Sequence, residues 1–309
     1  MSLLSFIGAI ELGLIYALLA FGIYISFRIL KIPDLTTDGS FVLGTAVSAM
    51  FAINGMPYIG IFAAMLAGVL AGIVTAVQQT KLGIQPVLSG ILTATALYTI
   101  NLMVMGGAPN ISLLQKRTVF TAWQALLGKF VNTSGQNAGV LILYKLIPLL
   151  IVTAIAYVML NLFFKTQLGI SIRATGDNEI MVRASSIDTD AARIVAFAIA
   201  NAMVALSGAL FAQMQQSTDI NVGSGMIVVG LASLIIGQVV VRGRGLWLGL
   251  VSVIVGAVLY RLLIALILNT SLPPSYLKLI SALVVITAVS VPVLKKKLGI
   301  ADRMRKEVR

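Results

Sequence analysis

The sequence contains no cysteine and no histidine among its 309 residues. Without cysteine the chain has no thiol nucleophile and no disulfide, and without histidine it lacks the commonest metal ligand and general base. Charged residues are also scarce, at 10%. These absences argue against enzymes built on thiol, imidazole or clustered carboxylate chemistry. They argue equally against a soluble globular domain, whose surface needs far more charge.

Long uncharged runs take the place of those residues. Residues 39–80 contain no Asp, Glu, Lys or Arg, and the same holds for 82–115, 146–164, 194–218 and 220–241. A helix needs about 20 apolar residues to cross the hydrocarbon core, so the first run holds two crossings, with the turn at 54–57. The runs show no period-2 alternation, which argues against a closed barrel. The sequence therefore predicts an all-α, polytopic transmembrane helical bundle.

The predicted bundle is one domain over 1–309 with about nine spans, within a range of about 8–10. The spans are 7–27, 39–54, 58–77, 85–105, 142–163, 193–214, 224–241, 246–268 and 276–294. An external loop at 106–141 is expected to include a short interfacial helix. The start of the chain lacks a basic n-region, and Glu11 interrupts its apolar stretch, so the first span is expected to remain in the mature protein.

The placement of basic residues predicts the orientation. If the C-terminus is cytoplasmic, nine basic residues of the loops and seven of the tail at 295–309 lie inside, out of 22. Positively charged loops stay on the cytoplasmic side, so we expect a cytoplasmic C-terminus and an external N-terminus. The net charge of +12 then reflects topology in a bacterial cytoplasmic (inner) membrane rather than nucleic-acid binding.

The loop at 165–192 is the most polar stretch of the chain. Gly176 can end one element, and Asp177 or Asn178 can cap a short helix through about Ser185, after which 186–190 turns the chain and caps the next span. A short amphipathic helix at the cytoplasmic surface suits docking of a soluble partner, although an ordinary well-capped connector explains the same pattern. The residues expected to dock are Arg173, Gly176, Asp177, Asn178, Glu179, Met181 and Arg183.

Asp34 and Asp38 bracket two threonines just after the first span. In one interpretation Asp38 or Thr37 caps the second span. In the other, Pro33 breaks the helix and the segment is partly re-entrant, lining a translocation path. The two interpretations are compatible, and capping is the minimum role. The candidate path residues are Asp34, Thr37, Asp38, Asn101 and Gln213.

Three further polar positions fall within or beside predicted spans. Glu11 lies near the outer end of the first span, where it either faces water or has a functional role. Gln238 is expected to hydrogen-bond between helices. Arg261 lies in an apolar span and needs water or a partner, for which Asp219 is the candidate.

Several stretches carry a resemblance to known transport proteins. Residues 169–179, 184–190 and the small-residue helix 198–212 resemble the permeases of branched-chain amino acid and ribose ABC importers. Residues 11–20, 32–41 and 96–111 are similar to tryptophan/tyrosine-type transport permeases. The most specific piece is Pro-Asp-Leu-Thr-Thr-Asp-Gly-Ser, which begins at Pro33, and the resemblance covers nearly the whole chain.

The resemblance implies a function and a set of partners. In this resemblance the loop at 165–192 is the coupling loop that docks on a cytoplasmic ABC ATPase. The resemblance also implies a second permease copy, either in a homodimer or in a pair of like permeases. An external substrate-binding lipoprotein or periplasmic protein delivers the solute, expected to be an amino acid, with aromatic ones included. The chain has no Gly-x-x-x-x-Gly-Lys-Ser/Thr loop, so ATP and Mg are expected on the ATPase, with no cofactor and no metal in this chain.

Two rival classes remain at this stage. An ion-coupled secondary transporter would need carboxylates or cation sites at mid-membrane, and the uncharged spans supply almost none. A membrane-embedded transferase would need clustered acids or histidines at a membrane face, and only 177–190 offers several acids together. We therefore expect a transport subunit and not an enzyme.

Overall fold

The computed structural model describes residues 3–127 and 138–268, apart from 242 and 244, and a few positions between 279 and 290. In chain order its elements are α1 (Leu3–Ile23), the π-helical turn η1 (Tyr24–Ile29), α2 (Thr37–Ile53), α3 (Pro57–Thr80), α4 (Pro86–Val104), β1 (Asn110–Ser112), α5 (Val119–Leu127), α6 (Ala138–Phe163), α7 (Gln167–Asp177), α8 (Glu179–Ala184), α9 (Thr189–Gln215), β2 (Ser217–Asp219), α10 (Met226–Val240) and α11 (Leu246–Leu268). The predicted ninth span and the basic tail lie outside the described residues, apart from those few positions.

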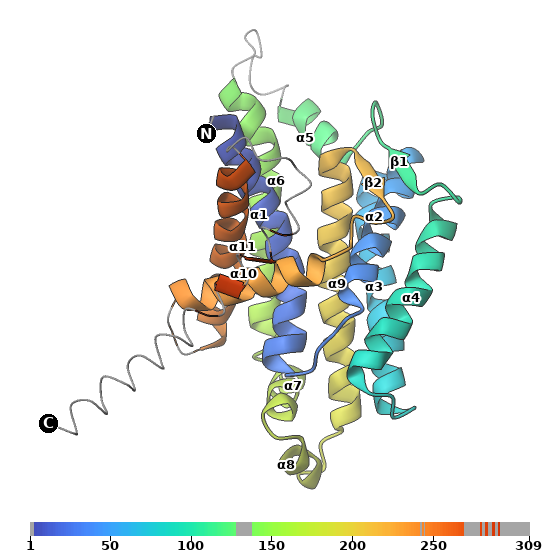
Figure 1. Cartoon of the computed structure of the whole chain (residues 1–309), viewed down its shortest axis with the longest axis vertical. Coiled ribbons are helices and arrows are strands. Elements are labelled where there is room, and N and C mark those ends of the chain that lie inside the picture. Colours follow the sequence, from blue (N-terminus) through green and yellow to red (C-terminus); the bar gives the residue numbers. More distant parts are fainter. Residues whose placement is uncertain are drawn as a thin grey trace, which may run out of the picture.

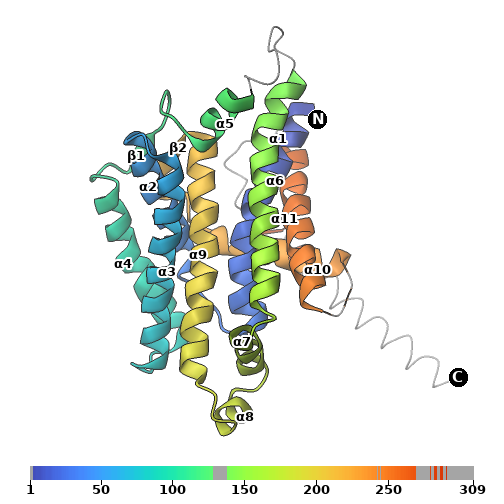
Figure 2. The same cartoon turned by 180° about the vertical axis from the view of Figure 1, so that it is seen from behind.

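Helices α1 and α9 form the centre of the bundle (Figures 1 and 2). Helices α2 and α3 pack on α9, α6 and α11 pack on α1, and α4 covers α2 from outside. Glycines let the backbones approach: a Cβ on Gly208 of α9 would overlap the Phe41 carbonyl of α2, and one on Gly44 would overlap the Ala205 backbone. Close backbone packing of this kind is common between helices in lipid.

The outer faces of α3, α4 and α6 carry large exposed apolar side chains. Examples are Phe62 at 69% exposure, Met103 at 72% and Met159 at 65%. Six helices of the described chain are long and apolar enough to cross a membrane: α1 with η1, α3, α4, α6, α9 and α11. The predicted all-α polytopic membrane bundle is therefore confirmed, and the short helix expected in the external loop is α5.

Two apolar helices are too short to cross as straight rods. Helix α10 has 15 residues, or about 22 Å, against about 30 Å of hydrocarbon. It lies across the long axis of the bundle (Figures 1 and 2), so the prediction of a crossing helix over 224–241 is corrected. Helix α2, with 17 residues, begins at mid-height, because the chain climbs back into the bundle over 30–36 (Figure 1).

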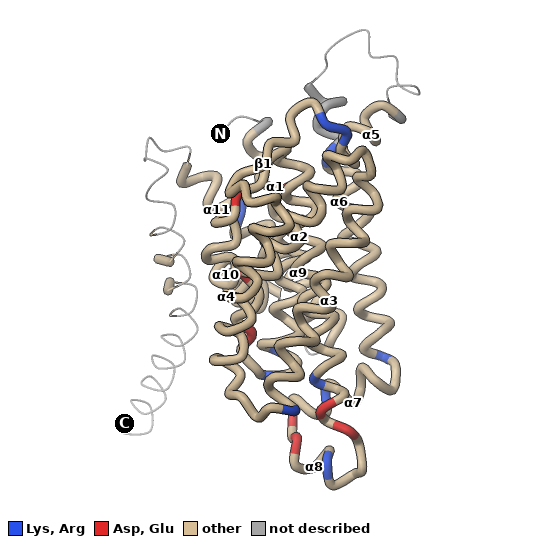
Figure 3. Tube along the Cα trace, turned by 90° about the vertical axis from the view of Figure 1, so that its right-hand side faces the viewer, with Lys and Arg blue, Asp and Glu red and all other residues tan. Residues whose placement is uncertain are grey.

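Charge gathers at the two ends of the bundle. Figure 3 shows a concentration of charged positions at the end that carries α7 and α8, which we call the α8 end. The opposite end, which carries β1, β2 and α5, is called the α5 end. The strands β1 and β2 pair antiparallel there, with Ile111 opposite Thr218, and join the loop after α4 to the segment after α9.

Candidate functional site

The short helix α8 forms the tip of the molecule at the α8 end (Figure 1). The Asn178 side chain caps it by accepting a hydrogen bond from the Met181 amide at 3.1 Å, which confirms the predicted capped helix. Its outer face is apolar and open: Ile180 is 83% exposed and Met181 64% exposed. Two large apolar side chains on a charged tip are unfavourable in water, and they suit the groove of a partner protein.

Ion pairs tie α8 to the start of α9. The Arg183 guanidinium lies 3.0 Å from Glu179 and 3.1 Å from Asp190, and it donates to the Thr189 hydroxyl at 2.8 Å. Arg193 of α9 pairs with Glu179. The charged side chains of α8 are thus paired with other groups of the chain. Ile180 and Met181 are the large apolar side chains of α8 that remain available to a partner.

The start of α9 is fixed by its own cap. The Asp188 carboxylate accepts from the amides of Asp190 at 2.9 Å and Ala191 at 3.0 Å, as the sequence predicted for 186–190. The Ala191 amide, with that of Asp190, holds the pKa of the Asp188 carboxyl below its ordinary value.

Helix α7 precedes α8, and its range was not predicted from the sequence. The sequence signal for this helix is Thr166, a residue type that favours the N-cap position. In the structure Thr166 caps α7 by accepting a hydrogen bond from the Gly169 amide at 3.3 Å. A Cβ on Gly176 would overlap the Ile29 carbonyl, so α7 lies directly on η1. Lys31 donates to Asp177 at 2.8 Å, and this bond and charge lower the pKa of the Asp177 carboxyl. The segment 165–192 is therefore tied both to η1 and to α9.

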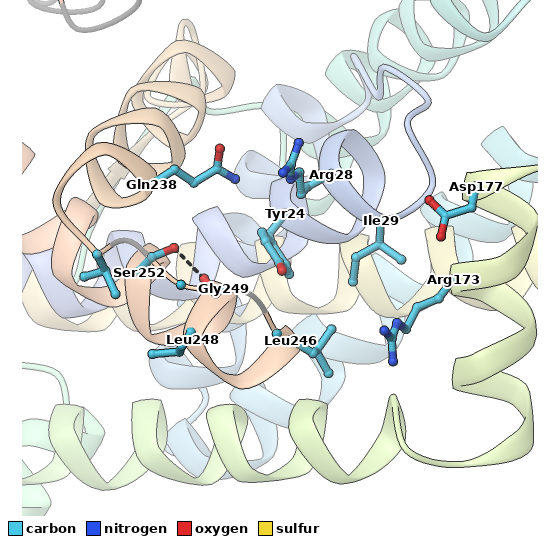
Figure 4. Close-up of a pocket in the computed structure, with 13 residues that line it drawn as sticks. Tyr24, Arg28, Ile29, Arg173, Asp177, Gln238, Leu246, Leu248, Gly249 and Ser252 are labelled. Atoms are coloured by element: carbon cyan, nitrogen blue, oxygen red, sulfur yellow. Dashed lines mark hydrogen bonds between the residues drawn. The ribbon is translucent and has the colours of Figure 1, made fainter. Parts of the chain in front are cut away.

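Two of the predicted docking residues, Arg173 and Asp177 of α7, line a cavity. The same cavity is lined by Tyr24, Arg28 and Gly249 (Figure 4). Gln238 lines the same cavity, and among the described residues it makes no hydrogen bond to another helix. The interhelical bond predicted for Gln238 is therefore not found within the part of the chain that the structure describes.

A buried polar cluster joins four parts of the chain at the centre of the bundle. Asp34 is 2% exposed and accepts from the Thr36 amide and from the Asn201 side chain, both at 2.9 Å. Ser40 donates to the Asn201 carbonyl oxygen at 2.6 Å, and the Thr36 and Thr75 hydroxyls lie 2.9 Å apart. The segment 30–36 is therefore bonded to α2, α3 and α9. Asn201 was missed from the sequence, where its only signal is an amide within an uncharged run.

Asp38 joins the starts of the two short helices. Its carboxylate accepts from the Gly225 amide at 3.0 Å and from the Ile227 amide at 2.8 Å, so it caps α10. The N-cap of α2 is Thr36, without a side-chain cap bond, and Thr37 donates to the Asp34 carbonyl. The prediction that Asp38 or Thr37 caps α2 is therefore wrong. The free amides at the start of α10 offer the carboxylate more donors than its own helix does.

The other two candidate path residues lie elsewhere. Asn101 donates to the Gly39 carbonyl at 3.2 Å, beside the start of α2, and its own buried oxygen has no partner among the described residues. Gln213 donates to Ser48 at 2.9 Å and accepts from the Val119 amide at 2.8 Å, near the α5 end. Asp34, Thr37 and Asp38 thus lie together, Asn101 adjoins them, and Gln213 connects helices at a distance from them.

The structure differs from the predictions made for Arg261, Asp219 and Glu11. The Arg261 guanidinium lies 5.1 Å from the centre of the Tyr16 ring, and Asp219 accepts from the Asn221 amide at 2.6 Å. The predicted pair of Arg261 with Asp219 is therefore not formed, since a cation over an aromatic face replaces it. Glu11 is buried at 8% exposure rather than facing water.

Short apolar helices that meet at the centre of a lipid-facing bundle are typical of membrane transport proteins. The comparison with protein families gives the particular class. The chain belongs to the family of branched-chain amino acid transport system permease components, which matches residues 5–289.

Relatives agree with that assignment. The chain is 32% identical to the tyrosine transport system permease protein of Clostridioides difficile, over 89% of this chain and 86% of the relative. It is 32% identical to an uncharacterized protein of Rickettsia prowazekii, over 92% of this chain and 96% of that protein. A shorter match, 35% identical over 32% of this chain and 27% of the relative, is to the autoinducer 2 import system permease protein LsrC of Escherichia coli. No solved structure matches the chain.

Proposed function

We propose that this chain is the membrane-spanning permease subunit of an ATP-binding-cassette importer. The observation that carries the proposal is the tip of α8 on a member of a transport permease family. Its exposed Ile180 and Met181 stand on a helix whose charges are bonded internally. A cytoplasmic ATPase docks on this apolar face, binds ATP and Mg, and drives the cycle.

The contacts of the coupling loop support a route for the movement. In the proposal, a displacement of α8 acts on α9 through Glu179 and Arg193. Helix α7 moves with it and acts on η1 through Gly176 and on Lys31 through Asp177. Helices α1 and α9 form the bundle centre, where the clusters around Asp34 and Asp38 are placed. In the proposal, rearrangement of these helices alternates access to the path. The chemistry of the permease is conformational rather than covalent.

The proposed solute is an amino acid, with aromatic amino acids included. Support comes from the name of the Clostridioides difficile relative. An external binding protein delivers the solute to the α5 end, and a second copy of this chain completes the translocation unit. In this scheme the α8 end and the C-terminus face the cytoplasm of a bacterium, because the basic residues concentrate on that side.

An ion-coupled secondary transporter is the alternative, and one observation favours it. Two carboxylates, Asp34 and Asp38, lie inside the bundle. Each is already bonded to donors of the chain, which leaves them less suited to carry a cation. Uptake into proteoliposomes separates the classes: uptake that needs ATP and a co-purified ATPase supports the importer, whereas uptake driven by an ion gradient without ATPase supports the alternative.

The docking surface is tested by a pull-down of the tagged chain, co-expressed with its neighbouring genes. The double variant Ile180→Ser/Met181→Ser removes the apolar pair and keeps the ion pairs of α8. Leu82→Ser at the same end is the matched control, because Leu82 is also open, at 68% exposure. We expect an ATPase with the wild type and the control and none with the double variant. Equal ATPase recovery with all three would contradict the proposed docking surface.

A further inference from the structure

Two neighbouring cavities at the α8 end share one arginine. The first, of about 510 Å³, lies between η1, α7, α10 and α11 (Figure 4). The second, of about 430 Å³, lies between α6, α7 and α11. Arg173 of α7 lines both, and so does Leu246 at the start of α11. The two hollows therefore meet around a single guanidinium group.

The charge around these cavities is positive. Arg28 and Arg173 line the first and Lys165 lines the second. The acidic side chain that lines the first cavity is Asp177, which is bonded to Lys31. Within the described part of the chain, no carboxylate lies within 4 Å of these three basic groups, whereas Lys31, Lys81, Arg183 and Arg193 at the same end all have acidic partners. Basic groups that outnumber the acidic ones in a concave surface attract an anion.

The second cavity opens beside a lipid-facing surface. Helix α6 reaches it with Asn161 and Tyr157, and the same helix exposes Val158 at 50% and Leu162 at 57%. On the other side stands Trp247 of α11, at 54% exposure. Tryptophan is enriched at the level of lipid headgroups. A strip of apolar side chains thus leads along α6 to a group of basic residues at the boundary of the bundle.

We propose that these cavities bind the headgroup of an anionic phospholipid. Arg173 contacts the phosphate, Lys165 and Arg28 flank it, and the acyl chains lie along α6 and Trp247. Basic pockets between transmembrane helices bind acidic headgroups in this way. A free phosphate would make no use of the apolar strip. The site also joins lipid to the coupling loop, because Arg173 lies on the helix whose Gly176 and Asp177 contact η1 and Lys31.

The test is lipid titration of the purified full chain, with bound lipids counted by native mass spectrometry. The probes are phosphatidylglycerol and phosphatidylcholine, and the variants are Arg173→Gln and Lys165→Gln. Lys81→Gln is the matched control, because it removes one charge at the same end, outside both cavities. We expect phosphatidylglycerol affinity to fall about five-fold for each cavity variant, the effect of about one neutralised basic contact. The control should leave it unchanged, and Arg173→Lys should retain most of it.

Four results would overturn the proposal. Equal retention of phosphatidylcholine would show that the headgroup charge is not recognised. An equal loss in Lys81→Gln would reduce the effect to overall charge. Displacement of phosphatidylglycerol by dilute inorganic phosphate would indicate a site for free anions. Unchanged lipid binding in Arg173→Gln, with loss of the ATPase in the pull-down, would assign Arg173 to the partner protein. The thermal midpoint of Arg173→Gln is measured as well. If it equals that of the wild type, a loss of lipid binding is not caused by unfolding.

Discussion

The Asp38 side chain connects α2 with α10, two helices that both start near the centre of the bundle. Replacing it by Asn removes the charge and one of the two acceptors that meet the amides of Gly225 and Ile227. Hydrogen bonds to charged groups contribute about 1.5–3 kcal/mol, so we expect Asp38→Asn to lower the free energy of unfolding by that amount and to slow transport. Unfolding in mixed micelles, followed by tryptophan fluorescence, measures the first effect. Asp219→Asn is the control, and a loss no larger than that of the control would contradict the capping role.

Asn201 holds the buried Asp34 carboxylate in place. In Asn201→Ala the Oδ2 atom of Asp34 and the hydroxyl of Ser40 both lose a partner. We expect unfolding to become easier by about 1.5–3 kcal/mol, against about 1 kcal/mol for Ser207→Ala, which removes a neutral bond from the same helix. The same micelle assay compares the two variants. Equal losses would mean that the charge of Asp34 plays no part.

At the scale of elements, α2 and α9 depend on glycine for their close approach. A Cβ on Gly208 would overlap the Phe41 carbonyl, whereas one on Gly8 of α1 meets nothing within 4 Å. We expect Gly208→Ala to destabilise the bundle by about 1–3 kcal/mol, because overpacking forces the backbones apart. Gly8→Ala should be neutral or stabilising by up to about 1 kcal/mol, since alanine is the better helix former. Thermal midpoints in detergent test both, and a stable Gly208→Ala would argue against the close packing.

The attachment of α7 to η1 should depend on pH. The partnership with Lys31 lowers the pKa of Asp177 in the folded chain, so its contribution is complete above the ordinary value of about 3.9 and is lost as the pH falls through the lowered value. Lys31→Gln should therefore weaken hydrogen-exchange protection of α7 at neutral pH, and its effect should shrink as the pH falls through the lowered pKa of Asp177. The expected effect is below about 1 kcal/mol, because the pair is exposed. A difference that persists at low pH would assign the effect to something other than the ion pair.

The positions of most helices along the chain could be predicted from the sequence, but their direction and position relative to the membrane could not. Uncharged runs and caps such as Asn178 and Asp188 report local structure, so the short helix α8 and the ends of most spans could be derived. The direction of α10 could not, because hydropathy describes composition and not tilt. The bond of Asp34 to Asn201 spans 167 positions, and that of Asp38 to Ile227 spans 189. Contacts at such separation leave no periodic signal in one chain.

At the scale of the whole molecule, the orientation of the bundle can be mapped directly because the chain has no cysteine of its own. Leu114, near the α5 end, is 68% exposed, and Ile180 at the α8 end is 83% exposed. We expect a membrane-impermeant maleimide to label Leu114→Cys in cells whose outer barrier is open. It should label Ile180→Cys only after the cytoplasmic membrane is permeabilised. The reverse pattern would invert the proposed topology.

The crosswise course of α10 has a mechanical consequence. One end of the helix is held by Asp38 at the start of α2, and the other end, at Val240, is followed in the chain by α11, which begins at Leu246. A rod of 15 residues is about 22 Å long, so a tilt of about 10° around the Asp38 end would lift or lower the far end by about 4 Å. A small rotation at the centre of the molecule would thus become a vertical stroke at its periphery, with α10 as the lever arm and Asp38 as its pivot.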